Sequence, residues 1–121
     1  MKKLLTIDDE PEFTELIEGY FGQRGYKVFK AGSGEVGLEI AKQEKPDICL
    51  IDIKMPGMHG DEALKEILLL RPDAKCIVVA ASEGQGKTKA HMLALGALAY
   101  FEKPLHSLRD LEKTIERLIS R

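Results

Sequence analysis

Five short apolar runs alternate along this chain with segments of helical periodicity, and this alternation strongly constrains the fold. Runs of this length predict β-strands. Because several of them are apolar throughout rather than at every second position, we expect the strands to be covered on both faces. The chain is therefore predicted to be an α/β protein with a parallel sheet and helices on both faces. The predicted strands are Lys3–Ile7, Tyr26–Ala31, Ile48–Ile51, Cys76–Ala81 and Leu98–Phe101.

Apolar spacing and terminal residues mark five intervening helices. Pro11 suits the first turn of a helix, and Ser107-x-x-Asp110 is the pattern of a capping box at the start of the last one. The helices are expected from Pro11 to Gly25, around Val36–Ala41 before Pro46, around Ala63–Leu68 before Pro72, from about Lys89 to Leu95 after a loop at Glu83–Gly86, and from Leu108 to Leu118.

Length and composition exclude several classes of protein. A chain of 121 residues has the length of one domain, and we expect residues 1–121 to form a single one. Its 18 Lys and Arg against 20 Asp and Glu create no basic field, so direct contact with nucleic acid is not expected. Cys49 and Cys76 lack zinc or CxxC spacing and are expected to be small buried residues. No apolar stretch approaches the ~20 residues that span a bilayer, and no signal-peptide core is present, so we expect a cytoplasmic protein without membrane contact.

Charged residues stand directly after three of the predicted strands. Asp8 and Asp9 follow the first strand, Asp52 follows the third, and Lys103 follows the fifth. The carboxyl ends of parallel strands form one edge, so three carboxylates converge there if the first and third strands are neighbours. Like charges this close require neutralisation, and oxygen ligands at an open site suit Mg²⁺ better than zinc. Each acid alone is more often a helix cap or a solvated turn residue, and Asp9 or Glu10 could cap the first helix.

A carboxylate, a divalent cation and a lysine together are suited to phosphoryl transfer. Asp52 is the best candidate nucleophile, because the turn Met55–Gly57 leaves the tip of its strand open. The product would be an aspartyl phosphate. The metal would neutralise the phosphoryl oxygens, and Lys103 would add a point charge.

Two further phosphate-binding patterns are weaker. Gly32–Gly37 matches GxGxxG between a strand and a helix, so a small nucleotide- or flavin-binding protein is one alternative. That interpretation leaves the strand-end acids and Lys103 unused, and the chain is too short for two nucleotide-binding halves. Gly86-Lys87-Thr88 is similar to the end of a P-loop, but Ala81 stands where that motif requires its first glycine.

Three segments together resemble the receiver domain of two-component response regulators: Asp8–Pro11, Leu50–Gly60 and Glu102–Pro104. The resemblance covers essentially the whole chain and implies a flavodoxin-like fold with strand order 2-1-3-4-5. It implies a histidine kinase or phosphotransfer protein as phosphodonor, and a downstream protein target or an output domain. It also implies that the domain catalyses its own phosphorylation and dephosphorylation without being a conventional enzyme. A homodimer through the fourth helix, fifth strand and fifth helix is compatible with it.

The same resemblance implies a role for individual residues. Asp52 would be the phosphoacceptor, and Tyr100 falls at the aromatic switch position of the family. Lys103 would contact the phosphoryl group, and its peptide bond to Pro104 would be cis. Mg²⁺ would be held by Asp9, Asp52 and the backbone carbonyl of Lys54, with Asp8 acting mainly through water.

The end of the fourth strand departs from the family pattern. The family has Thr or Ser there, whose hydroxyl binds a phosphoryl oxygen. Counting forward from Asp52 leads to Ala80, counting back from Lys103 leads to Ala81, and only the adjacent Ser82 could supply a hydroxyl. A degenerate receiver, which binds partners independently of phosphorylation, is therefore a second alternative.

Overall fold

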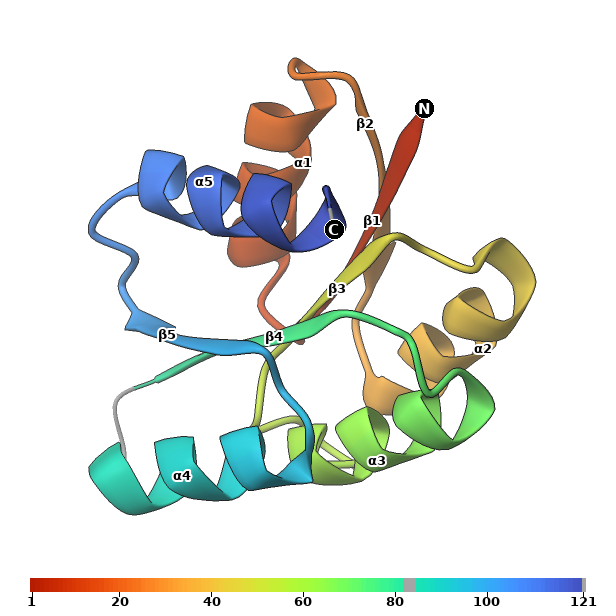
Figure 1. Ribbon diagram of the computed structural model, residues 1–121, viewed down its shortest axis with the longest axis vertical. Helices are drawn as coiled ribbons and strands as arrows, with labels where there is room; N and C mark the ends of the chain where they lie inside the picture. The colour runs from red at the N-terminus through yellow and green to blue at the C-terminus, as the bar shows by residue number, and fades with distance from the viewer. Residues whose placement is uncertain (82–84, 121) are drawn as a thin grey trace.

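A computed structural model of the chain describes residues 1–81 and 85–120, with the side chains of residues 85–87 left out of the description. Within these residues, five strands alternate with five helices (Figure 1). The elements are β1 Lys2–Ile7, α1 Pro11–Gly22, β2 Tyr26–Ala31, α2 Gly34–Glu44, β3 Ile48–Ile51, α3 Gly60–Leu70, β4 Cys76–Ala81, α4 Gln85–Leu95, β5 Ala99–Lys103 and α5 Leu108–Ile119.

The strands form one parallel sheet in the order β2-β1-β3-β4-β5. Helices α1 and α5 cover one face of the sheet, and α2, α3 and α4 cover the other (Figure 1). This arrangement confirms the predicted fold and the strand order that the resemblance implies. It also makes β1 and β3 direct neighbours, with Ile7 paired to Ile51, so the residues that follow these two strands lie side by side.

Both faces of the sheet are buried, which explains the unbroken apolar runs. Alternate residues of the strands pack against different helices, in two clusters on opposite sides of the sheet. One cluster, against α2, α3 and α4, includes Leu5, Ile7, Ile51, Val78 and Met92. The other, against α1 and α5, includes Leu4, Leu50, Ile77, Phe21 and Leu111.

Local sequence signals set several of the helix starts. Pro11 occupies the first turn of α1. The hydroxyl of Ser33 accepts a hydrogen bond of 3.2 Å from the backbone N–H of Val36 at the start of α2. Ser107 accepts a comparable bond of 3.1 Å from Asp110 N–H, as the predicted capping box requires.

Three predicted boundaries were wrong. Helix α1 ends at Gly22, three residues before the predicted end at Gly25. Helix α4 begins at Gln85, about four residues before the predicted start at Lys89, so residues 85 and 86 of the expected loop are helical. Its first turn lacks the apolar residues from which periodicity is read. Strand β5 runs over Ala99–Lys103 rather than Leu98–Phe101, because it continues in register beside the end of β4.

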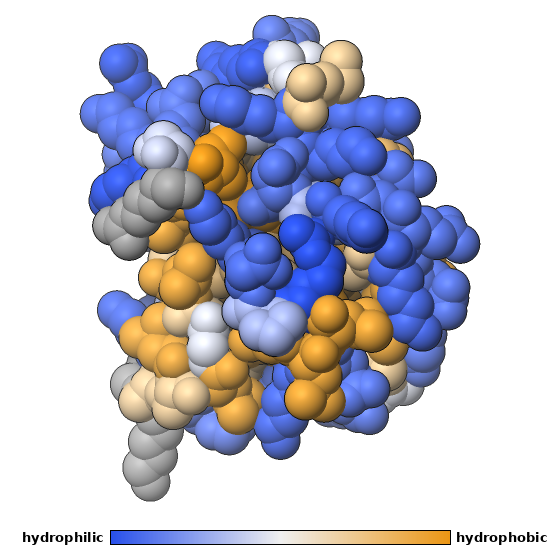
Figure 2. All heavy atoms as spheres, turned by 45° about the vertical axis from the view of Figure 1, so that its right-hand side comes forward, coloured by the Kyte–Doolittle hydropathy of each residue, from blue (hydrophilic) through white to orange (hydrophobic). Residues whose placement is uncertain are grey.

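Several exposed leucines lie on α3, on α4 and just before β5. Figure 2 shows apolar side chains on the lower part of one face, over α3 and α4. Leu69 is 76% exposed, and Leu93 and Leu98 are also exposed. Cys49 and Cys76 are buried, as predicted, and are free cysteines. Among the residues described, no helix has the length and apolarity needed to cross a membrane.

Candidate functional site

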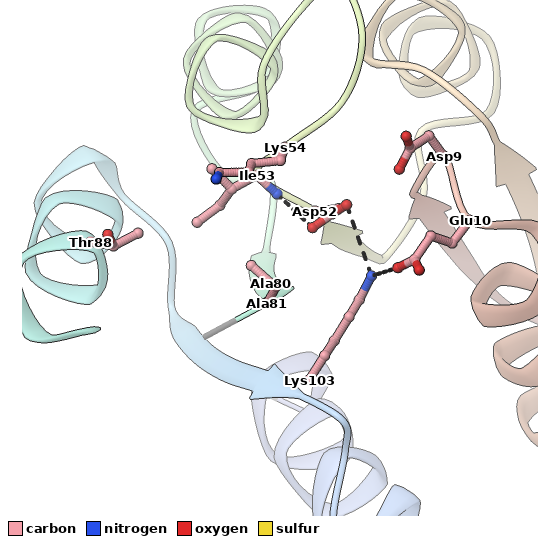
Figure 3. A pocket seen from close by; sticks show the side chains of 9 residues that line it. All are labelled: Asp9, Glu10, Asp52, Ile53, Lys54, Ala80, Ala81, Thr88 and Lys103. Carbon is pink, nitrogen blue, oxygen red and sulfur yellow. Dashed lines mark hydrogen bonds and ion pairs between the residues drawn. The ribbon is translucent and has the colours of Figure 1, made fainter. Parts of the chain in front are cut away.

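A pocket of about 530 Å³ opens at the carboxyl edge of the sheet. Figure 3 shows acidic side chains on one side of this pocket, Lys103 beneath them, and Thr88 on α4 across from them. The residues that line the pocket come from the carboxyl ends of β1, β3, β4 and β5, the loops after them, and helix α4: Asp9, Glu10, Asp52, Ile53, Lys54, Ala80, Ala81, Thr88 and Lys103.

Asp52, the first residue after β3, is fixed by its backbone. Its N–H donates to the carbonyl oxygen of Ile7 at 2.9 Å, and its Oδ1 accepts from the N–H of Ile53 at 2.9 Å. The chain then turns back sharply, and Gly60 N–H donates to the carbonyl of Ile53 at 2.7 Å. A Cβ atom at Gly60 would lie only 2.1 Å from the carbonyl oxygen of Asp52, so this close approach requires glycine. The turn leaves Asp52 only 7% exposed, bordering the pocket.

Three carboxylates lie together at this edge. Asp8, Asp9 and Asp52 each offer an oxygen atom, and these atoms all lie within 4.8 Å of one another. Asp8 is 2% exposed, whereas Asp9 is exposed. Carboxylate oxygens at this spacing form a donor set that fits a hard divalent cation such as Mg²⁺. The convergence predicted from the strand ends is therefore present.

Lys103 is held by short contacts with Asp8 and Glu10. Its Nζ donates to Asp8 Oδ2 at 2.6 Å and to Glu10 Oε1 at 2.8 Å, and it lies 3.9 Å from Asp52 Oδ2. It also lies 4.5 Å from the ring centroid of Phe13, within the range of a cation–π contact. The lysine side chain is only 14% exposed. These contacts place its ammonium group beside the Asp52 carboxylate.

Glu10 has a different role from the one that the sequence suggested. It occupies the N-cap position of α1, but its side chain makes no capping hydrogen bond there. Instead it reaches Lys103, and its own N–H donates to Asp8 Oδ1 at 2.9 Å. From the sequence, Glu10 is a possible helix cap and a member of the Asp8–Pro11 segment, with no site role of its own. Its position directly after the two strand-end acids was the available signal for membership of the site.

Burial and mutual repulsion raise the pKa values of the buried acids. Burial, reinforced by the Asp8 charge, raises the pKa of Asp52 to about 6, and Lys103 offsets only part of this effect. Burial also raises the pKa of Asp8 above its ordinary value in spite of the lysine. Burial alone would lower the pKa of Lys103, but its hydrogen bonds to Asp8 and Glu10 raise it. Without a metal ion, the negative charge of the clustered carboxylates therefore exceeds the positive charge of Lys103.

The end of β4 contributes two alanines to the pocket. Ala80 pairs with Glu102 and is buried, while Ala81 pairs with Lys103 and is exposed. Ala81 is thus the residue beside the lysine at the end of the strand. Ser82, the adjacent residue that could supply a hydroxyl, lies outside the described residues.

The remaining predicted site residues lie near the pocket or along β5. Lys54 lines the pocket and is exposed. The Lys103–Pro104 peptide bond is cis, the isomer that the resemblance implies. Tyr100 is half-buried on β5 and packs against the cluster beneath α2, α3 and α4.

Two of the three glycines of the GxGxxG pattern, Gly34 and Gly37, have packing roles, whereas a side chain at Gly32 would meet no other atom of the described residues within 4 Å. A Cβ atom at Gly37 would lie 2.4 Å from Ile7 Cδ1, and one at Gly34 would lie 3.0 Å from the Met58 side chain. Ser33 between the first two glycines caps α2. The pattern is therefore explained by a helix start packed closely on the sheet and on the loop after β3.

Comparison with known proteins indicates one family. The family model of the response regulator receiver domain matches residues 4–116. Sporulation initiation phosphotransferase F of Bacillus subtilis is 34% identical over 114 residues, which cover 93% of this chain and 91% of that protein.

Solved structures agree with this comparison over nearly the whole chain. A CheY-like receiver domain protein from Methanospirillum hungatei is 31% identical, with a TM-score of 0.92 over 99% of this chain and 94% of that one. The response regulator TrrA of Thermotoga maritima, solved in complex with Mg²⁺ and BeF, is 30% identical, with a TM-score of 0.86 over 98% of this chain and 99% of that one.

Proposed function

The chain belongs to the response regulator receiver domain family of two-component systems, and on that premise we propose that Asp52 accepts a phosphoryl group from a histidine kinase or a phosphotransfer protein. One observation carries this proposal. Asp52 is a buried carboxylate whose oxygen lies within 4.8 Å of those of Asp8 and Asp9 and 3.9 Å from the Lys103 ammonium. Helix capping does not account for such a cluster, and phosphoryl transfer makes use of each of its members.

In the proposed reaction, a carboxylate oxygen of Asp52 bonds to the phosphorus of phosphohistidine. The P–N bond breaks as the new O–P bond forms, and the imidazole leaves with its electron pair and takes up a proton. The product is an acyl phosphate. Attack of water on phosphorus then releases inorganic phosphate and restores the Asp52 carboxylate, which resets the switch.

The residues present fit the divalent cation that this chemistry uses. Asp8, Asp9, Asp52 and the backbone carbonyl of Lys54 would hold Mg²⁺, and the cation when bound neutralises charge on the phosphoryl oxygens. The Asp8 and Glu10 carboxylates hold the Lys103 ammonium beside Asp52 before the phosphodonor arrives. Such positioning removes the need to order the lysine during the reaction.

Phosphorylation would act as a switch for partner binding. The new dianion on Asp52 would compete with Glu10 for Lys103 and so change the contacts at the ends of β4 and β5. We expect it to shift an existing equilibrium at the surface formed by α4, β5 and α5, which includes Tyr100. A downstream protein, an output domain or a second copy of the chain would bind there.

The test is covalent labelling with a small phosphodonor. The protein is incubated with Mg²⁺ and phosphoramidate, and intact mass spectrometry is expected to show one added phosphoryl group. Asp52→Asn should abolish the label, whereas the matched change Asp73→Asn, at an exposed acid just before β4, should not. Labelling that persists in Asp52→Asn would refute the assignment.

The alternative of a degenerate receiver rests on the alanines at the end of β4. It predicts that beryllofluoride leaves the amide NMR spectrum around Tyr100 unchanged even when Mg²⁺ binds. The complete acid cluster and the adjacent Lys103 favour phosphoryl acceptance instead.

A further inference from the structure

Among the described residues, the wall of the pocket opposite the acids presents methyl groups and one hydroxyl. The end of β4 contributes the side chains of Ala80 and Ala81, which cannot donate a hydrogen bond. Among the described residues that line the pocket, the hydroxyl belongs to Thr88 on α4. Thr88 is half-buried, and Figure 3 shows it facing the pocket from the side across from Asp9 and Glu10.

A phosphoryl group on Asp52 would need a donor on this wall. It has three oxygen atoms that share a charge of nearly −2, and each favours a charged or hydrogen-bonding neighbour. Lys103 can serve one oxygen, and a cation held by the acids can serve another. An anionic oxygen left against Ala80 and Ala81 would lose water without gaining a hydrogen bond, which is unfavourable.

The dimensions of the pocket leave room for α4 to approach. Its volume of about 530 Å³ is several times that of a phosphoryl group, so a bound group would not fill it. Ala81, which pairs with Lys103, has a small side chain and lines the same pocket as Thr88. Thr88 also interacts with another residue in this structure, and a hydroxyl can rotate to donate elsewhere.

We propose that Thr88 donates a hydrogen bond to a phosphoryl oxygen on Asp52 and so draws the start of α4 into the pocket. This inference rests on the proposed function. It adds a residue of α4 to those that bind the phosphoryl group. In a receiver with a hydroxyl at the end of β4, the strand end makes this contact. Here the contact would act directly on a helix of the expected partner surface.

The experiment uses beryllofluoride with Mg²⁺ as the probe of the phosphorylated state, and amide NMR titration as the readout. Loss of a hydrogen bond to a charged group corresponds to roughly a tenfold or larger change in affinity. Thr88→Val should therefore weaken beryllofluoride binding at least about tenfold and reduce the shifts in α4. Thr88→Ser should remain close to the wild type. Thr114→Val, the same change on α5 outside the pocket, should have no effect.

Two further variants separate a donor from a structural role. Adding Ala81→Thr to Thr88→Val should restore most of the affinity, because it returns a hydroxyl to the same wall. A loss that neither Thr88→Ser nor Ala81→Thr repairs would overturn the inference. It would also be overturned if Thr88→Val bound beryllofluoride like the wild type, or if Ser82→Ala alone caused the loss.

Failure of this inference can be distinguished from failure of the proposed function. If the wild type takes a label from phosphoramidate at Asp52 and Thr88→Val leaves beryllofluoride binding unchanged, only the role of Thr88 is refuted. If the wild type neither binds beryllofluoride nor takes a label, phosphoryl acceptance itself is refuted.

Discussion

Replacing Asp52 by Asn should stabilise the metal-free protein at neutral and alkaline pH. The Asp52 carboxylate is 7% exposed and lies beside the almost fully buried Asp8 and the exposed Asp9. Asparagine has nearly the same volume, and its amide oxygen can still accept the hydrogen bond from Ile53 N–H. The substitution therefore removes a charge that burial and repulsion disfavour while it leaves the packing intact.

The magnitude follows from the pKa of Asp52, which rises from 3.8 to about 6 on folding. One pH unit of difference in pKa corresponds to about 1.4 kcal/mol, so the charged form destabilises the fold by about 3 kcal/mol at most. This upper limit already includes the attraction of Lys103 at 3.9 Å, which lowers the pKa of Asp52. We therefore expect a net gain of about 1–3 kcal/mol in the free energy of unfolding.

The pH dependence has a definite sign. Between pH 4 and 6 the folded protein binds more protons at Asp52 than the unfolded chain does, so its stability falls as the pH rises through this window. The advantage of Asp52→Asn should be complete above about pH 6 and absent below about pH 4. Mg²⁺ should reverse the order, because it binds the folded wild type and adds about 1.4 kcal/mol for each tenfold excess over its Kd.

Urea unfolding followed by circular dichroism tests this reasoning. The two proteins are compared in EDTA at pH 8 and at pH 4, with Asp73→Asn as the matched change at an exposed acid. Equal stability of wild type and Asp52→Asn at pH 8 would show that the acids do not repel one another as described. A gain in stability of Asp52→Asn that was as large at pH 4 as at pH 8 would lead to the same conclusion.

Three further predictions concern the backbone, the metal site and the lysine contacts. Gly60→Ala should lower the free energy of unfolding by more than about 2 kcal/mol in the same urea assay, because the added Cβ atom would clash with the backbone of Asp52 and Ile53. Gly19→Ala, at an open position of helix α1, should raise the free energy of unfolding by up to about 1 kcal/mol. Asp9→Asn should weaken Mg²⁺ binding at least about tenfold by calorimetry, since it removes one of three clustered carboxylates. Glu10→Gln should change stability by less than about 1 kcal/mol, because Glu10 is 61% exposed and Lys103 keeps its other partners.

Much of the site was predictable because the carboxyl ends of all strands of a parallel sheet lie at the same edge. Asp8, Asp9, Asp52 and Lys103 each stand directly after or at the end of an apolar run, and parallel pairing brings such positions to one edge. The contact of Glu10 was not predicted, because the sequence offers this residue only as a possible cap of the first helix. Its contact with Lys103 joins residues 93 positions apart, and no local pattern encodes such a distance.

The sequence by itself determined the α/β class, most element boundaries and the group of residues that follow the strands. These properties depend on apolar periodicity, helix caps and glycine or proline positions, which act over a few neighbouring residues. Only the tertiary structure decided which residues touch: Lys103 between Asp8 and Glu10, Ala81 beside the lysine, and Thr88 across the pocket. The raised pKa of Asp52 also belongs to the folded state, because it arises from burial and from a charge brought close by the pairing of β1 with β3.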